Sequence, residues 1–369
     1  MTRRPNGETL DQRALNRATL ARQLLLERVE MPAVAAIEHL AGMQSQAPHA
    51  PYVGLWTRLS GFRATELSDL TAAREAVRGP LMRATLHLVS SRDYLALRPV
   101  IQPVLERGFA GSPFDISGVD VDSLLAVGRE LIEHRPQTRA ELGPRLAERW
   151  PESDPTSLAQ AVTYLVPTVQ VTPRGLWAQS GQARWTTIEA WLRRDPDPEP
   201  SRERLVLRYL GAFGPATVRD IQTWSGLTRL GEVVDRLRPE LTTFRDESGS
   251  ELLDLPDAPR PGAEVAAPPR FLPEYDNLLL SHADRTRFIT GGERVPLQPG
   301  LGARYGTLLV DGVFRGTWRI TRHDERAVLH VEPFEQLSAA TRDAIAEEGE
   351  ALVRFAVEDA DRYETRFDG

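Results

Sequence analysis

The sequence feature that most constrains the fold is a unit of helices followed by strands, which recurs three times at intervals of roughly 80–100 residues. In the last copy, three segments have apolar side chains at helical spacing, and Gly226 marks the turn between the second and the third. Two short strands then flank a tip at Ser248-Gly249. The helical segments are 202–210, 214–224 and 228–237, and the strands are 241–244 and 251–255. This order predicts a winged helix.

The two earlier copies follow the same order. In the first copy, helical spacing over residues 16–26 and 32–42 is followed by a strand-like alternation over 81–89. That alternation places Arg83, Thr85 and His87 on one face. The second copy has predicted helices at 121–133, 138–146 and 157–166 and predicted wing strands at 169–180 and 183–187.

Proline-rich linkers at 195–200 and 256–269 separate the units. Beyond the second linker the apolar period changes to two, which predicts a hairpin over 306–320 with its turn at Asp311-Gly312. A strand at 328–331, a helix at 338–350 and a last strand at 352–357 complete the prediction. The fold class is therefore mainly α with β wings: three tandem winged-helix motifs (1–118, 119–195, 201–256) and a small C-terminal α+β domain (270–369).

Composition removes several kinds of chemistry. The chain has no Cys, and all 45 of its Lys+Arg residues are Arg, so it has no Lys. Thiol nucleophiles and side-chain Schiff bases are excluded. The seven histidines show no metal-ligand spacing, and we expect no metal and no cofactor.

Net charge is −7, which argues against a general basic surface for nucleic acid. The charge is uneven: residues 1–110 carry 14 Arg and 10 Asp+Glu (+4), whereas 261–369 carry 13 and 19 (−6). There is no apolar run of 18 residues and no signal-like start, so we expect a cytoplasmic protein that does not bind membranes.

Gln44-Ser45-Gln46 is the most unusual local sequence. Pro48 favours extended backbone there, which would place both amides on one face. Two amide oxygens can orient a water and put partial negative charge near a developing cation. Because amides are weak bases, such a pair suits a reaction whose leaving group is already activated. The alternative is a solvated helix end with backbone capping.

Four segments resemble the AlkZ-type DNA glycosylases, a winged-helix superfamily that also contains YcaQ. The resemblance covers about residues 13–357. The four segments are Leu40-Ala41-Gly42-Met43-Gln44-Ser45-Gln46-Ala47-Pro48 with Leu55-Trp56-Thr57-Arg58-Leu59, residues 81–89, Phe271 to His282, and Val310 to Arg319. The resemblance implies three winged helices, a C-terminal β-containing domain, and a catalytic QxQ pair at Gln44 and Gln46. YcaQ has a QxD motif. This chain has Gln46 at the position of that Asp, so it lacks the strong base that the Asp would supply.

The resemblance further implies a monofunctional DNA glycosylase that hydrolyses the N-glycosidic bond of N7-alkylguanine, including bulky or crosslinked adducts, in DNA repair or self-resistance. Its partner would be double-stranded DNA, bound by a monomer. Without Lys, no side-chain imine is available for strand cleavage. The other hypothesis is a non-enzymatic winged-helix transcription regulator, which would footprint undamaged DNA.

We expect further DNA contacts from seven residues: Arg83, Thr85, His87, His49, Arg58, Asp311 and Gly312. Each has an ordinary structural alternative. A histidine can form a buried hydrogen bond or sit in a solvated loop, the arginine can be solvated at the surface, and the Asp-Gly turn can close a plain hairpin.

Overall fold

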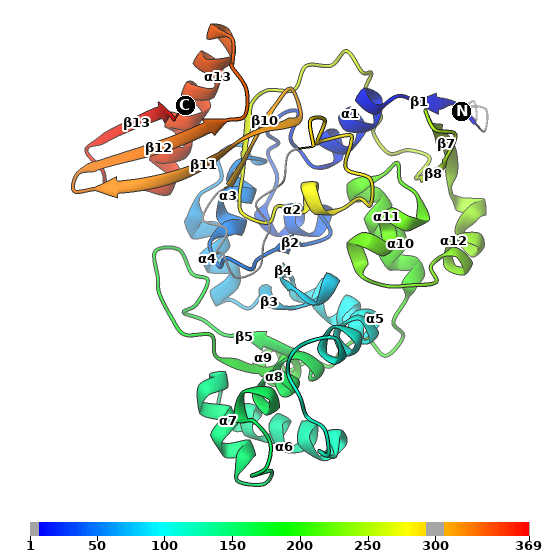
Figure 1. The fold of residues 1–369 in the computed structure, drawn as a ribbon, viewed down its shortest axis with the longest axis vertical. Coiled ribbons are helices and arrows are strands. Elements are labelled where there is room, and N and C mark those ends of the chain that lie inside the picture. Colours follow the sequence, from blue (N-terminus) through cyan, green and yellow to red (C-terminus); the bar gives the residue numbers. More distant parts are fainter. Residues whose placement is uncertain (1–6, 293–305, 369) are drawn as a thin grey trace.

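The computed structural model describes residues 7–292 and 306–368 and shows a mixed helix and sheet fold (Figure 1). Between residues 7 and 110 the structure has nine α-helices and β-strands. They are β1 (Thr9–Leu10), α1 (Gln12–Arg22), α2 (Ala33–His39), β2 (Met43–Gln44), α3 (Ala50–Trp56), α4 (Ala64–Ala72), β3 (Ala76–Pro80), β4 (Leu86–Ser90) and α5 (Ser91–Ala110).

A central five-stranded sheet joins the first two predicted units. Its order is β2-β4-β3-β5-β6, where β5 is Thr168–Gln170 and β6 is Trp185–Thr187. The link is the pairing of Arg78 on β3 with Gln170 on β5, across the predicted boundary at residue 118. The wings of these two units therefore form one sheet, and the count of three separate winged helices stays a prediction.

The predicted strand over 81–89 is wrong in its first half. Residues 82–84 form a 3-10 turn in which Arg83 and Ala84 have φ angles of +55°, and β4 begins only at Leu86. Period-two alternation cannot distinguish a strand from a turn whose side chains happen to alternate. Arg83, Thr85 and His87 consequently do not share a strand face.

The second unit forms at one end of the molecule (Figure 1). Its predicted helices are confirmed as α6 (Val121–His134), α7 (Arg139–Ala147) and α8 (Pro155–Leu165). A capping box of Thr138 and Glu141 fixes the start of α7, as the sequence predicts. The predicted wing strands are much shorter than expected, and a short helix α9 (Ile188–Leu192) follows β6.

The third unit also has its predicted elements. They are α10 (Arg202–Phe213), α11 (Val218–Ser225), α12 (Gly231–Leu237), β7 (Thr242–Asp246) and β8 (Glu251–Asp254). The N-terminal strand β1 adds to this wing parallel to β7, which local sequence does not indicate. A buried pair of hydrogen bonds from Arg22 on α1 to Asp254 on β8 fixes the two regions together.

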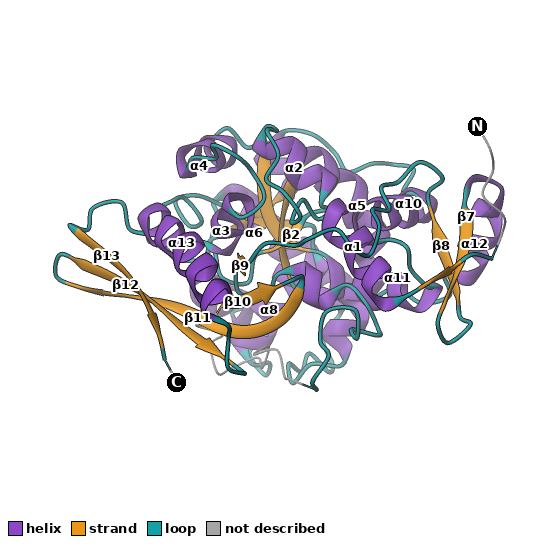
Figure 2. Cartoon of the chain, turned by 90° about the horizontal axis from the view of Figure 1, so that it is seen from above, coloured by secondary structure: helices purple, strands orange, loops and turns teal. Residues whose placement is uncertain are grey.

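The C-terminal domain is a five-stranded sheet with α13 packed on one face (Figure 2). Its order is β13-β12-β11-β10-β9, from β9 (Arg270–Leu272), β10 (Gly306–Val310), β11 (Val313–His323), β12 (Arg326–Pro333) and β13 (Arg362–Phe367). The Asp-Gly hairpin is confirmed. The predicted strand at 352–357 is wrong, because α13 (Ala339–Ala356) continues through it. Ile345, Gly349, Leu352 and Val353 are buried along this helix at helical spacing, so one apolar stripe faces the sheet.

Candidate active site

The Gln44-Ser45-Gln46 segment lies at the edge of the central sheet. Gln44 pairs with His87 on β4, and Ser45 N donates to Leu86 O at 2.8 Å. The predicted extended backbone is therefore confirmed at Gln44, and the alternative of a helix end is wrong. The strand β2 ends at Gln44, and Gln46 lies in the bend that follows, so the two side chains line different cavities.

Gln44 is buried and its amide is held by Arg83. Arg83 Nη2 donates to Gln44 Oε1 at 2.6 Å and to Asn277 Oδ1 at 2.8 Å, while Nη1 donates to Trp224 O at 2.8 Å. Burial, and secondarily Arg285, lowers the pKa of Arg83 to about 10, so it remains a cation at neutral pH. Gln44 Oε1 thus already accepts one hydrogen bond, from Arg83, and the expectation that both amide oxygens orient one water stays a prediction.

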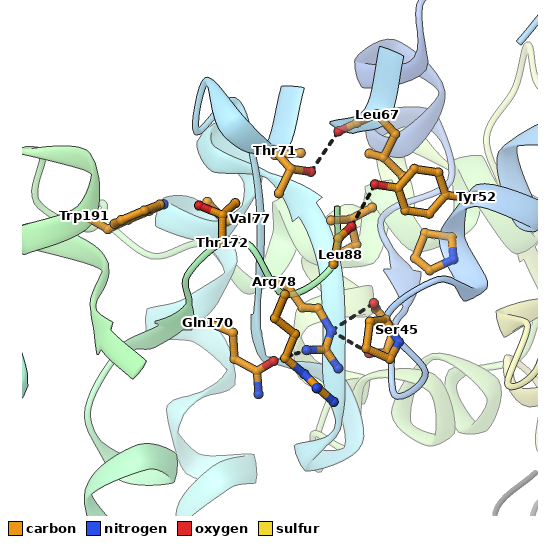
Figure 3. Close-up of a pocket in the computed structure, with 15 residues that line it drawn as sticks. Ser45, Tyr52, Leu67, Thr71, Val77, Arg78, Leu88, Gln170, Thr172 and Trp191 are labelled. Carbon is orange, nitrogen blue, oxygen red and sulfur yellow. Dashed lines mark hydrogen bonds between the residues drawn. The ribbon is translucent and has the colours of Figure 1, made fainter. Parts of the chain in front are cut away.

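Arg78 holds the backbone of the same segment through hydrogen bonds (Figure 3). Its Nε donates to Ser45 O at 2.7 Å and to Ser45 Oγ at 3.0 Å, and Nη2 donates to Gln46 O at 3.2 Å. Nη1 contacts Gln170 Oε1 on the neighbouring strand. Burial, with Arg174 as the second cause, lowers the pKa of Arg78 to about 9. Because all four acceptors are neutral, this cation orders the chain without a carboxylate.

Gln46 is the exposed member of the pair. Its Oε1 accepts from Leu86 N at 3.3 Å, a long bond that little constrains the amide. The side chain borders a cleft of about 380 Å³ between the first and second units. Tyr164 and Trp185 line the cleft, and the guanidinium of Arg139 stacks over both rings, 5.8 Å and 5.0 Å from their centroids.

His87 is fully buried, so it cannot reach a phosphate. Its Nδ1 lies 3.2 Å from Thr85 O, and Nε2 has no partner within the described parts of the chain. Burial, and then the charge of Arg83, lowers the pKa of His87 to about 3, which keeps it neutral. The structure thus assigns His87 to the core. Thr85 is half-buried, and its hydroxyl donates to Met82 O at 3.1 Å within the turn.

Arg58 is also buried, and its predicted phosphate contact is wrong. It donates to Asp276 Oδ2 and Oδ1, each at 2.9 Å, and to the backbone oxygens of Gln23 and Gly54. Its terminal nitrogens are thereby used inside the protein. His49 is exposed; its Nε2 lies 3.2 Å from Leu176 O, and its ring lies edge-on to Trp177. A DNA contact of His49 stays a prediction.

The hairpin tip is docked on α1. Asp311 accepts from Arg13 at 2.6 Å and from Arg17, and Asn16 Nδ2 donates to Gly312 O at 2.8 Å. Gly312 has a φ of +76°, and a Cβ there would lie 2.6 Å from Asn16 Oδ1. Gly312 is therefore enclosed by α1 and is not presented to DNA. The Asp311 side chain is 48% exposed, and its contact with DNA stays a prediction.

The loop after β9 has no local sequence pattern that indicates a role, although it belongs to one of the four segments that resemble the AlkZ-type glycosylases. Asp276 binds Arg58, and Asn277 receives Arg83 and donates to Gly42 O at 3.2 Å. Between Pro273 and these residues, Tyr275 has a φ of +60°, an unusual angle for this side chain. The loop, Gln44 and Arg58 line one small cavity. The signal available in the sequence was the Asp-Asn pair after a short strand.

Two cations near Arg83 were also missed. Arg107 on α5 donates to Gly226 O at 2.6 Å, beside the turn that carries Arg83. Arg285 is close enough to Arg83 to lower its pKa. They come from helices and loops far apart in sequence, so no local pattern could have brought them together.

Comparison with known proteins defines the class. The family model for DNA glycosylase AlkZ-like proteins matches residues 37–355. The chain therefore belongs to the AlkZ-like DNA glycosylase family. Among solved structures, the Streptomyces sahachiroi DNA glycosylase AlkZ is similar, with a TM-score of 0.72 and 20% identity over 98% of this chain and 100% of that chain. At this identity the likeness shows a shared fold. No curated protein matches the sequence.

The family membership favours the enzyme over the transcription regulator. In the described parts of the chain, no helix has the length and apolar character needed to cross a bilayer. The same residues contain no cluster of three or more His, Asp or Glu side chains placed to hold a metal ion.

Proposed function

We propose that the protein is a monofunctional DNA glycosylase that releases N7-alkylguanine from double-stranded DNA, with Gln46 and Gln44 at the reacting nucleotide. The observation that carries the proposal is the fixed QSQ backbone. Strand pairing with β4 and the buried Arg78 hold it in place, while the Gln46 side chain stays exposed beside a cleft. A rigid backbone with one exposed amide can position a small nucleophile.

The chemistry needs no strong acid or base. Alkylation at N7 places a positive charge on the guanine, so the base can leave with the bonding electrons as a neutral molecule. Positive charge then develops at C1′ of the sugar. Gln46 Oε1 would accept a hydrogen bond from the attacking water and lie near this charge. The water oxygen bonds to C1′, and its proton passes to solvent. One such group contributes about 10²- to 10³-fold in rate.

The product is expected to be an intact abasic site, because the chain has no Lys to form an imine with the opened sugar. The cleft beside Gln46 supports the acceptance of bulky or crosslinked adducts. At about 380 Å³ it has the volume of a small-ligand site and exceeds what a methyl group needs.

The test is release of N7-methylguanine from alkylated duplex DNA by the wild type and by the Gln46→Ala and Gln44→Ala variants. We expect base release by the wild type and a loss of about 10²-fold in Gln46→Ala under single-turnover conditions. Full activity of both variants would remove these residues from the mechanism. Cleavage of the strand at neutral pH, above spontaneous breakage, would contradict the monofunctional assignment.

A further inference from the structure

The side chain of Arg83 determines the orientation of the Gln44 amide. A guanidinium has only N–H donors, so the atom of Gln44 that lies 2.6 Å from Arg83 Nη2 must be the amide oxygen. The same argument applies to Asn277, whose Oδ1 meets Arg83 and whose Nδ2 donates to Gly42 O. Both amides are therefore oriented by one cation.

The Gln44 NH₂ group has no hydrogen-bond partner in the described parts of the chain. In residues 7–292 and 306–368, no hydrogen bond involves Gln44 Nε2 as donor, and no ion pair joins Arg83 to a carboxylate. The positive charge of Arg83 thus lies behind the amide without a counter-charge. It polarises the amide so that its N–H groups become better donors.

The turn that carries Arg83 is held from two sides. Tyr164 from α8 donates to Ala84 O at 3.2 Å, and Arg83 itself donates to Trp224 O of the third unit. On the same side, the position of a Cβ on Gly226 would lie 3.4 Å from Arg83 Cα, so there is little space for the turn to move. Two consecutive residues with positive φ need such support. The orientation of Gln44 is therefore built into the packing of all three units.

We propose that Arg83 is a positioning residue that fixes Gln44 as a hydrogen-bond donor to a phosphodiester oxygen of the lesion strand, leaving the attacking water to Gln46. The inference rests on the proposed function for its substrate. A donor backed by a cation suits an anionic oxygen, whereas the same positive charge next to a developing sugar cation would raise its energy. The two glutamines of the motif thus have different tasks.

The decisive variant is Gln44→Glu. A carboxylate at this position can still accept from Arg83, so the fold is retained, but it has no N–H to donate and repels a phosphate. We expect binding to methylated duplex DNA, measured by fluorescence anisotropy, to weaken by about 10- to 100-fold. If Gln44 instead presented an oxygen to water or to the sugar cation, Gln44→Glu would bind normally and excise the base at least as fast as the wild type, and the proposal would fail.

Asn277→Asp is the matched control. It places a carboxylate on the same guanidinium and makes the same change in charge, but it leaves the Gln44 amide in place. We expect it to weaken binding far less than Gln44→Glu. Equal weakening would mean that neutralising Arg83, rather than losing the donor, causes the effect, and would overturn the assignment. Melting temperatures of both variants check that the fold is intact.

A neutral methylphosphonate at each phosphate flanking the lesion identifies the acceptor. At one position, we expect the substitution to weaken wild-type binding and to have little added effect on Gln44→Glu. If the methylphosphonate and Gln44→Glu are coupled at no position, the phosphate contact is refuted. A sugar oxygen as the acceptor would give this result. These binding measurements do not depend on catalysis. A wild type that binds DNA and releases no base would refute the proposed function, and the coupling between the methylphosphonate and Gln44→Glu would still support or refute the phosphate contact of Gln44.

Discussion

Replacing Arg58 with Met tests whether this arginine stabilises the fold or binds DNA. Its side chain is 2% exposed, and it donates to both oxygens of Asp276 at 2.9 Å. Two further bonds, of 3.0 Å and 2.9 Å, go to the backbone oxygens of Gln23 and Gly54. Removing the guanidinium leaves the Asp276 carboxylate buried without its partner. Loss of one member of such a pair costs about 3–5 kcal/mol, which we expect as the decrease in unfolding free energy.

A double variant separates the pair from its surroundings. Arg58→Met combined with Asp276→Leu removes both charges and leaves no unpaired carboxylate. We expect it to be more stable than the sum of the two single losses predicts, with a coupling of roughly 0.5–3 kcal/mol. Asp276 also accepts from Leu278 N at 3.0 Å. Part of the stability lost on replacing Asp276 will therefore be independent of Arg58.

The assay is urea unfolding followed by tryptophan fluorescence, together with DNA binding measured over a range of salt concentrations. Because Arg58 is not at the surface, we expect the slope of log affinity against log salt to be unchanged. A phosphate contact would contribute about 0.9 to that slope. A stability loss below about 1 kcal/mol, together with a slope reduced by this amount, would refute the structural assignment.

Three other predictions use the same unfolding measurement. Gly312→Ala should lose roughly 1–3 kcal/mol, because its φ is +76° and the added Cβ would lie 2.5 Å from Leu20 Cδ1; an unchanged urea midpoint would show that the hairpin tip is loose. His87→Gln should flatten the pH dependence between about 3 and 6.5. The folded pKa of His87 is lowered to about 3, so only the unfolded chain binds a proton there, and stability falls as pH decreases. Glu274→Gln should have the opposite signature. Burial raises the pKa of Glu274 to about 7, so the folded chain keeps a proton between pH 4.5 and 7 and stability falls as pH rises; the variant should be more stable than the wild type at pH 8 and differ little at pH 4.

Much of the secondary structure was predictable because its signals are local. The capping boxes of Thr138 with Glu141 and of Thr217 with Asp220 fix the starts of α7 and α11 within a few residues of chain. The Asp-Gly turn likewise fixes the C-terminal hairpin. The short apolar run at 352–357 fits both the helical period and the period of a strand. Local sequence predicted a strand there, and the structure has a helix. Only packing of Leu352 and Val353 on the sheet selects the helix there.

For the candidate site, the sequence by itself determined the residue types. It supplied the two amides and the extended backbone before Pro48. It also supplied a chain without Lys or Cys, in which Arg is the only strongly basic side chain. Tertiary structure decided how these residues are used. It buried Arg58 against Asp276, and it aimed Arg83 at the oxygen of Gln44. The physical reason is that a guanidinium binds whichever acceptors the fold brings within 3 Å. Those acceptors lie 39, 194 and 218 residues away along the chain, beyond the reach of any local pattern.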